Sequence, residues 1–478
     1  MMKRPVWPIV IYLMWSSLLT YSSVFSAEIP PSTNLTDLLN KYGIPKSSVS
    51  IDIREVQNQT PVLILNRDIP RNPASVIKLL TTLSSLELLG PAYNWETHYL
   101  REGDLVDGVL KGDLIMQGGG DPFLTVDRFW RHVQSIRQRG IQHIRGDFVI
   151  DNSLFDIPPH NPGAFDGKAT RLYNVGPSAS LVNFSATQFI IRPSDGKISI
   201  FADPPLSNLH IENNLKAGNG KCNGPQSGWS FETTTRENRL IARFNGRYQS
   251  RCGQYSLGRN LISNEQYTFR LFEQLWLASG GTIDGNLKIT NASQNAIPIV
   301  SQPSESLSDI ISSINKFSNN VMARQLLLTT GFHLYGKPAT LETGMGAIQS
   351  WLDHHALSMP NLVLENGSGL SRKARVTAKE LADLLDHGWR SNYRPEFLSS
   401  FSLSALDGTM RKRLKETPIQ GRARIKTGLI NGIRSMAGYL HSKSGHHYSV
   451  VMMIDSKKVN YWNGNQIQDA LLSWLYYR

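Results

Sequence analysis

A serine and a lysine three residues apart, Ser75 and Lys78, could act as a nucleophile and its base. They lie at the start of a predicted helix, where this spacing places both side chains on one helical face. A serine hydroxyl is a poor nucleophile until a base removes its proton, which a neutral lysine amine can do. The alternative is that Ser75 is an ordinary N-cap after Pro73. The same spacing occurs in two other pairs, Ser194/Lys197 and Ser313/Lys316.

Two later segments carry side chains suited to the same cleft. Ser318-Asn319-Asn320 falls between two predicted helices, where a loop can project side chains into a cleft. Lys426-Thr427-Gly428 ends a predicted strand, and the Lys-Thr-Gly triplet occurs once in the chain. If none of the motifs were functional, Ser75 would be a helix cap, residues 318–320 a turn and residues 426–428 a strand end. These three would then have to fall in this order by coincidence. We therefore predict a serine-based active site built from all three motifs.

Periodicity predicts the elements that position these motifs. Alternating residues predict strands at 48–54 and 61–65, and apolar residues at helical spacing predict a helix at 75–89. Further helices are expected at 307–317, 321–328, 340–354, 377–388 and 465–476, and further strands at 423–426, 436–440 and 448–454. Residues 93–300 have a turn-rich β texture, interrupted by one predicted helix near 126–139. The layout predicts an α+β fold, an antiparallel sheet flanked by helices, with the N- and C-terminal segments in one sheet.

Length and texture also set the expected domains. A chain of 478 residues is long enough for two or three domains. We expect a catalytic domain at 28–92 and 300–478, one accessory domain at 93–185 and 262–299, and another at 186–261. The β-rich stretch between the first two motifs is thus predicted to be an insertion with cores of its own.

The N-terminal residues have the layout of a secretory signal peptide, predicted at residues 1–27. Lys3 and Arg4 precede an apolar run at 6–19, and small residues follow as far as Ala27. An uncleaved membrane anchor is the alternative, but the uninterrupted apolar stretch is shorter than the roughly 20 residues that a span requires. We expect an exported, periplasmic protein.

The chain has two cysteines, Cys222 and Cys252, in a stretch rich in Gly, Asn, Gln and Ser. Export favours a disulfide between them, which would close one local loop. Two free thiols or half of a metal site are the alternatives. The metal site is disfavoured because no Cys-x-x-Cys or neighbouring histidine cluster supplies further ligands.

A net charge of +12 makes nucleic acid a partner to consider. The basic residues are scattered, however, and the densest run, at 411–415, is predicted to be the solvated face of a helix. We therefore predict no nucleic-acid partner. For an exported basic protein we expect weak peripheral attraction to anionic wall polymers or membrane head groups.

The three motifs, in this chain order, are shared by penicillin-binding proteins and serine β-lactamases. Further segments extend the likeness, at 108–114, 119–122, 366–372 and 407–410. With them the chain resembles class C low-molecular-mass penicillin-binding proteins, the D-alanyl-D-alanine carboxypeptidase/endopeptidases. The resemblance implies a β-lactamase/transpeptidase-like catalytic domain with a long insertion forming one or two accessory domains. One departure is Asn319, where many relatives have aspartate at a position that is usually structural.

The resemblance also implies a role for each residue around the reacting bond. Ser75 would be the nucleophile, Lys78 its base, and Ser318 a proton relay to the leaving amine. The oxyanion hole would use the backbone N–H groups of Ser75 and Ile430.

The implied substrate is a peptidoglycan stem peptide ending in D-Ala-D-Ala. Asn320 would bind its amide, and Lys426, Thr427 and Gly428 would form the site of its terminal carboxylate. β-Lactam antibiotics would acylate the same serine, and no metal or organic cofactor is required.

Two other functions compete with this interpretation. A β-lactamase would use the same chemistry with faster deacylation, but β-lactamases lack the long insertion. A catalytically idle wall-binding protein would keep the fold alone, and the complete set of motif residues argues against it.

Overall fold

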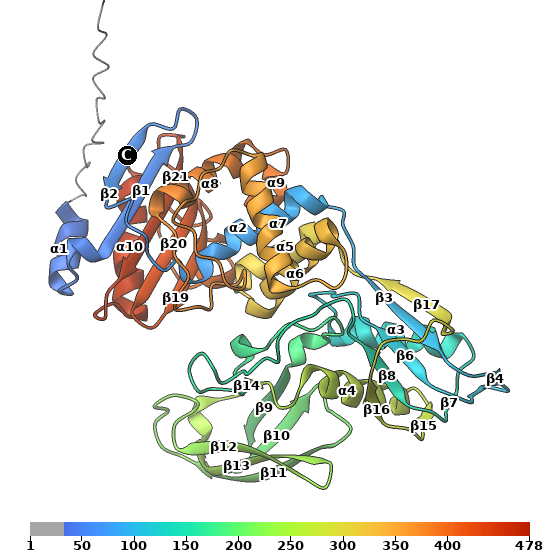
Figure 1. Cartoon of the computed structure of the whole chain (residues 1–478). Helices are drawn as coiled ribbons and strands as arrows, with labels where there is room; N and C mark the ends of the chain where they lie inside the picture. Colours follow the sequence, from blue (N-terminus) through green and yellow to red (C-terminus); the bar gives the residue numbers. More distant parts are fainter. Residues whose placement is uncertain (1–32) are drawn as a thin grey trace, which may run out of the picture.

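The computed structural model describes residues 33–478. The predicted signal peptide, residues 1–27, lies outside the described residues. Figure 1 shows one part that combines helices with the first and last strands of the chain, and a second, β-rich part formed by the middle of the chain. Among residues 33–478, no helix is both long and apolar enough to cross a bilayer.

A six-stranded antiparallel sheet forms the centre of the first part. Its strand order is β18-β19-β20-β21-β1-β2. β1 (Val49–Glu55) pairs along its whole length with β21 (His447–Asp455), so the two ends of the chain share one sheet, as predicted (Figure 1). The other strands are β2 (Pro61–Leu65), β18 (Ser402–Leu403), β19 (Ala423–Ile430) and β20 (Ile433–His441).

Helices cover both faces of this sheet, which confirms the predicted α+β arrangement. On one face α1 (Thr33–Lys41) and α10 (Tyr461–Tyr476) share a core with the strands. On the other face α2 (Lys78–Leu89) and α8 (Ala378–Arg390) belong to a larger core. The remaining helices of this part are α5 (Leu307–Phe317), α6 (Asn320–Tyr335), α7 (Leu341–His354) and α9 (Arg394–Ser399). All four contact α2, whose first nine residues are buried.

The middle of the chain begins and ends with a second unit of two sheets. Their strand orders are β16-β8-β6-β3-β17 and β15-β7-β5-β4. The strands are β3 (Glu96–Arg101), β4 (Leu105–Val106), β5 (Val109–Leu110), β6 (Leu114–Gln117), β7 (His143–Ile144), β8 (Phe148–Asp151), β15 (Thr282–Ile283), β16 (Leu287–Ile289) and β17 (Ile297–Pro303). Helices α3 (Val126–Gln138) and α4 (Asn264–Ala278) pack with these strands in one core.

A third unit lies between β8 and α4. It has two three-stranded sheets, of orders β10-β9-β14 and β11-β13-β12, around a core of its own. The strands are β9 (Thr187–Ser194), β10 (Lys197–Asp203), β11 (Leu209–Gly218), β12 (Trp229–Arg236), β13 (Arg239–Gln249) and β14 (Tyr255–Arg259). The predicted disulfide between Cys222 and Cys252 is confirmed, and it closes a local loop of this unit.

Three details of the predicted elements were wrong. One helix was predicted in the middle of the chain, but the structure has two, α3 and α4. The prediction missed α4, whose buried face is largely aromatic, with Phe269, Phe272 and Trp276. Residues 411–415 form turns, and Arg413 is held by an ion pair with Asp469 at 2.7 Å. The helix expected from residue 75 begins at Lys78, after a short 3-10 turn.

Candidate active site

Ser75 lies in a tight turn that its neighbours hold in place. The turn is the 3-10 segment η2 (Ala74–Ile77), and Ala74 has a positive φ of 46°. Such a backbone costs a non-glycine residue on the order of 1–3 kcal/mol and persists where surrounding contacts fix it. Here Asn72 accepts a hydrogen bond from the N–H of Ala74 at 2.8 Å and donates one to the carbonyl of Ser371 at 2.8 Å. No side chain caps the turn, so Ser75 does not act as an N-cap.

Lys78 is fully buried, and its Nζ atom contacts three oxygen atoms. Nζ lies 3.0 Å from Oγ of Ser75, 2.7 Å from Oδ1 of Asn320 and 2.5 Å from the carbonyl oxygen of Ser368. The last two oxygens can only accept hydrogen bonds. A neutral amine has two N–H groups and one lone pair, so Asn320 and Ser368 take both N–H groups. The lone pair then faces the hydroxyl of Ser75, which is the arrangement that a general base requires.

The charges around Lys78 favour this neutral form. Burial and two nearby cations, Lys426 and Arg324, hold the pKa of Lys78 well below its usual value. Burial also lowers the pKa of Arg324 to about 10, so this guanidinium is still charged at neutral pH. A neutral Lys78 can accept the proton of Ser75.

The second motif places two side chains beside the lysines and uses the third to start a helix. Ser318 ends α5 in a left-handed conformation with φ 56°, and its Oγ accepts a hydrogen bond from Nζ of Lys426 at 2.8 Å. Asn319 is the N-cap of α6 and accepts a hydrogen bond from the N–H of Met322 at 3.2 Å. Asn320, the first residue of α6, is the one that contacts Lys78. The middle residue therefore has a structural role, as expected.

Strand β19 brings Lys426 to the opposite side of the site. Its Nζ is fully buried and donates to Ser318 and to the carbonyl of Thr427, each at 2.8 Å. Burial lowers the pKa of Lys426 to about 7. The hydroxyl of Thr427 donates to Oγ1 of Thr409 at 2.9 Å. The ammonium group of Lys426 and the hydroxyl groups of Thr427 and Thr409 together can bind a carboxylate group.

Gly428 allows β19 to lie against the turn that carries Ser75. A Cβ atom at this position would lie 2.1 Å from Oγ of Ser435 and 2.7 Å from the carbonyl oxygen of Pro73. Ser435 itself donates to that carbonyl at 2.6 Å. The absence of a side chain is thus what brings the first and third motifs into contact.

The strand register changes one expectation, the second oxyanion donor. Ile430 pairs with Ile433 across the two-residue turn between β19 and β20, so its N–H donates into the hairpin. The carbonyl of Thr427 faces the other edge of β19, where it accepts from Lys426. Because backbone polar groups alternate between the two edges of a strand, the N–H of Leu429 points to the edge occupied by Lys426. The register favours Leu429, not Ile430, as the backbone donor on the cleft side.

The other two Ser-x-x-Lys pairs lack such surroundings. Ser194 and Lys197 are exposed and face each other across the β9–β10 hairpin. Lys316, which follows Ser313, forms an ion pair with Asp407 at 2.8 Å. Ser75 and Lys78 are the pair that meets the second and third motifs.

The site also contains contributors that sequence reasoning missed. Nδ2 of Asn320 donates to the carbonyl of Tyr173 at 3.0 Å, and Arg324 donates to the carbonyl of Val175 at 2.9 Å. Residues 173 and 175 belong to the inserted segment, so the insertion borders the cleft. For Arg324 a signal existed, since its spacing of four from Asn320 puts both on one helical face.

Comparison with known proteins identifies the family. The chain matches the D-Ala-D-Ala carboxypeptidase 3 (S13) family over residues 32–476. It therefore belongs to this family of serine peptidases, which are hydrolases. D-alanyl-D-alanine carboxypeptidase DacB of Haemophilus influenzae is 24% identical over 442 residues, covering 90% of this chain and 90% of that protein.

Solved structures show the same fold. Penicillin-binding protein 4 (dacB) from Haemophilus influenzae superposes with a TM-score of 0.76 at 22% identity, covering 94% of this chain and 100% of that chain. The penicillin G acylated predatory endopeptidase Bd3459 from Bdellovibrio bacteriovorus gives a TM-score of 0.50 at 15% identity, covering 90% and 92%. The expected resemblance to class C penicillin-binding proteins and the penicillin-binding fold with accessory domains are confirmed.

Proposed function

We propose that this enzyme cleaves D-Ala-D-Ala stem peptides of peptidoglycan through an acyl-enzyme on Ser75. The observation that carries the proposal is the contact of 3.0 Å between Nζ of Lys78 and Oγ of Ser75. Both N–H groups of a neutral Lys78 are already occupied, so the remaining lone pair is directed at the serine proton. Family membership supplies the substrate class.

In the first half of the reaction, the proton of Ser75 moves to Lys78 while Oγ forms a bond to the carbonyl carbon of the penultimate D-Ala. The backbone N–H groups of Ser75 and Leu429 stabilise the resulting oxyanion. The proton that Lys78 took from Ser75 is relayed through Ser318 to the leaving amine as the bond between carbon and nitrogen breaks, so Lys78 is neutral again. The products are an ester on Ser75 and a free amine.

In the second half, water forms a bond to the acyl carbon and the bond between this carbon and Oγ of Ser75 breaks. Oγ takes back a proton from the water, and the shortened peptide leaves as a carboxylic acid. Release of terminal D-Ala is carboxypeptidase action, and release of a cross-linked amine is endopeptidase action. Asn320 binds the substrate amide. Lys426 and Thr427 bind the terminal carboxylate, with Gly428 shaping that part of the site.

β-Lactams should acylate Ser75, and the resulting acyl-enzyme should be hydrolysed slowly. The endopeptidase from Bdellovibrio is acylated by penicillin G in its solved structure. A β-lactamase needs a base that activates the deacylating water. Two acidic residues near the motifs are committed elsewhere: Glu87 contacts His387 at 3.0 Å, and Asp309 accepts from Ser306 at 2.6 Å. Slow deacylation is the outcome we expect.

The place of action we propose is the periplasm, where peptidoglycan is accessible to an exported enzyme. The layout of residues 1–27 and the disulfide between Cys222 and Cys252 support export. The proposed domain limits remain those inferred from the sequence, with a catalytic domain at 28–92 and 300–478.

A product assay tests this function. The mature enzyme is incubated with a stem pentapeptide ending in D-Ala-D-Ala and, separately, with a cross-linked stem-peptide dimer. We expect release of D-Ala, of monomer, or of both by the wild type, no release by Ser75→Ala, and wild-type release by the control Ser313→Ala. Release by Ser75→Ala at the wild-type rate would contradict the proposal, as would no release from either substrate by the wild type.

A further inference from the structure

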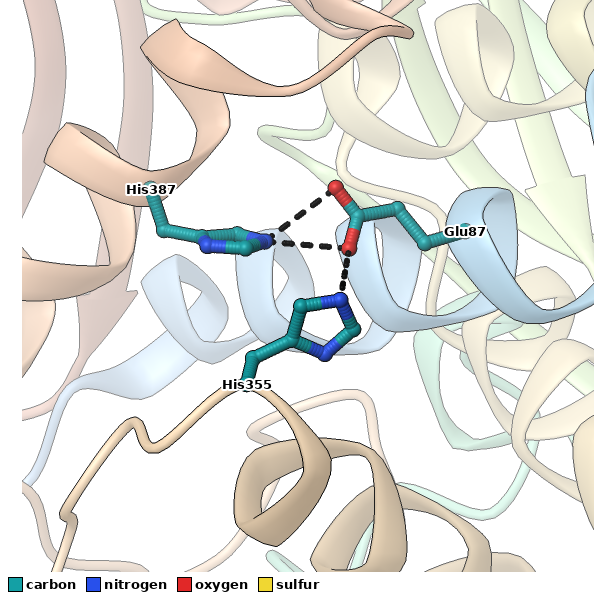
Figure 2. Close-up of side chains that lie close together, drawn as sticks. All are labelled: Glu87, His355 and His387. Atoms are coloured by element: carbon teal, nitrogen blue, oxygen red, sulfur yellow. Dashed lines mark hydrogen bonds and ion pairs between the residues drawn. The ribbon is translucent and has the colours of Figure 1, made fainter.

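Three side chains of the kind that bind metals meet away from the catalytic cleft. Figure 2 shows Glu87 of α2, His355 directly after α7, and His387 of α8 pointing toward one another. One ligand atom from each lies within 4.8 Å of the other two. Nε2 of His387 lies 3.0 Å, and Nε2 of His355 3.3 Å, from the same carboxylate oxygen of Glu87.

The hydrogen bonding of His355 calls for a cation in this cluster. Nδ1 of His355 lies 2.9 Å from the carbonyl oxygen of Trp351, which can only accept, so Nδ1 carries the hydrogen. A neutral ring then presents a lone pair at Nε2. That lone pair faces a carboxylate oxygen of Glu87, which also only accepts. A positive centre, either a proton on the ring or a metal ion, must relieve this opposition of two lone pairs.

The geometry suits a metal ion of the zinc class. Two imidazoles and one carboxylate form a zinc ligand set, with metal–ligand distances of about 2.0–2.2 Å. Ligands at that radius around a tetrahedral ion are about 3.3 Å apart, close to the distances between Glu87 and the two histidines. A backbone carbonyl that fixes the second ring nitrogen, as Trp351 does for His355, is the usual support of a histidine ligand.

Neighbouring side chains hold Glu87 in place, and a surface pocket makes the three side chains accessible to an ion. Nε1 of Trp351 donates to Glu87 at 3.0 Å, and Oγ of Ser391 donates to it at 2.5 Å, so the carboxylate is held in place. All three ligands line a surface pocket of about 610 Å³. The pocket gives an ion a path of entry and room for a solvent ligand.

We propose that Glu87, His355 and His387 bind one divalent transition metal ion, with zinc as the favoured ion and water as the fourth ligand. Glu87 lies nine residues beyond Lys78 in α2, about 13 Å along the helix axis. The ion therefore does not reach the reacting atoms. It joins α2 to α8 and to the end of α7, and so fastens the helix that carries Lys78.

Zinc binding by the full mature chain tests this proposal. Metal-free protein is dialysed against micromolar Zn²⁺, and bound metal is counted per chain. We expect one ion per chain in the wild type and a rise in Tm of several degrees on binding. His355→Gln and His387→Gln should each lose at least tenfold in affinity and lose the Tm shift. The matched control is His354→Gln, the neighbouring exposed histidine that is not among the three ligands, which should bind as the wild type does.

Two results would overturn the proposal. One is a wild type that binds no stoichiometric zinc, which would leave a protonated His355 as the source of the charge. The other is unchanged affinity in both His355→Gln and His387→Gln. Labelling by penicillin shows whether each variant is folded. Co²⁺ bound to the wild type gives a readout without any substitution, since it should show the intense visible absorption of four-coordinate cobalt rather than the weak bands of six-coordinate cobalt.

Discussion

Two fully buried lysines set the chemistry of the cleft at the scale of single residues. Lys78 and Lys426 are surrounded by hydroxyl, amide and carbonyl oxygens rather than by carboxylates. Burying a charge without an ionic partner is costly, so both groups hold their protons weakly. One can therefore act as a base near neutral pH, and the other can respond to the charge of a bound carboxylate.

Arg324 should tune the basicity of Lys78 as a positioning residue that does not touch substrate. In Arg324→Met, loss of a neighbouring positive charge raises the pKa of Lys78. A larger fraction of Lys78 is then protonated at acidic pH, where it cannot accept the proton of Ser75. The acidic limb of the pH profile for acylation by penicillin should therefore move to higher pH, with a lower rate at any given pH on that limb. Arg324→Lys keeps the charge and should keep the limb. An unmoved limb in Arg324→Met would rule out this role.

Lys426 should control how substrate binding depends on pH. Its pKa is about 7 in the free enzyme, so the ammonium group is lost as pH rises through 7. KM for a peptide with a free carboxylate should then rise by up to about tenfold per pH unit above 7. Lys426→Arg keeps its charge over this range. Its KM should be higher than that of the wild type but nearly constant from pH 6 to pH 9. An equal rise in both enzymes would show that another group is responsible.

At the scale of elements, the close approach of β19 to the turn η2 assembles the site. Gly428→Ala places a Cβ atom against Ser435 and the backbone of Pro73, and overpacking of this kind costs about 1–3 kcal/mol. We expect lower stability in urea and a fall of at least tenfold in the acylation rate. Gly346→Ala in α7 is the control, because its nearest neighbour is Tyr335 at 3.6 Å and stability should be kept or slightly raised. Wild-type acylation by Gly428→Ala would show that this contact is unimportant.

The sequence predicted which elements carry the motifs but not how they meet. Ser318 and Lys426 were assigned to the correct kind of element because local patterns encode a loop and a strand, whereas Ser75, predicted to begin a helix, lies in a 3-10 turn directly before α2. The register of Ile430 with Ile433, which favours Leu429 over Ile430 as the oxyanion donor, depends on strand pairing that no local pattern encodes. Nor does any local pattern link Asn320 to Tyr173, which lies 147 residues away.

At the scale of the whole molecule, the inserted middle of the chain forms a separate β-rich part beside the part that holds the first and last strands (Figure 1). The segment with Tyr173 and Val175 contacts α6, whereas residues 187–258 form the third unit around its own core. The chain enters and leaves this unit at neighbouring points, since Asn260 donates to the carbonyl of Ser185 at 3.1 Å. The two parts of the insertion should therefore differ in their importance for catalysis.

Replacing residues 187–258 with a short Gly-Ser linker tests that difference. Because the cleft contacts lie outside the deleted stretch, we expect a folded protein that reacts with penicillin within about threefold of the wild-type rate. Stability should fall, since Leu206 and Leu240 also contribute to the core of the second unit. A folded deletion variant that no longer reacts with penicillin would show that the third unit shapes the cleft.

The central claim, that Ser75 is the nucleophile, is tested most directly by locating the acyl group after penicillin treatment. Mature protein is treated with penicillin, digested and mapped by mass spectrometry. We expect one long-lived adduct, on the peptide that contains Ser75, with none in Ser75→Ala and slower labelling in Lys426→Ala, because each charge-assisted hydrogen bond contributes roughly 1.5–3 kcal/mol. An adduct on Ser194 or Ser313, or hydrolysis of penicillin within seconds without any adduct, would contradict the account.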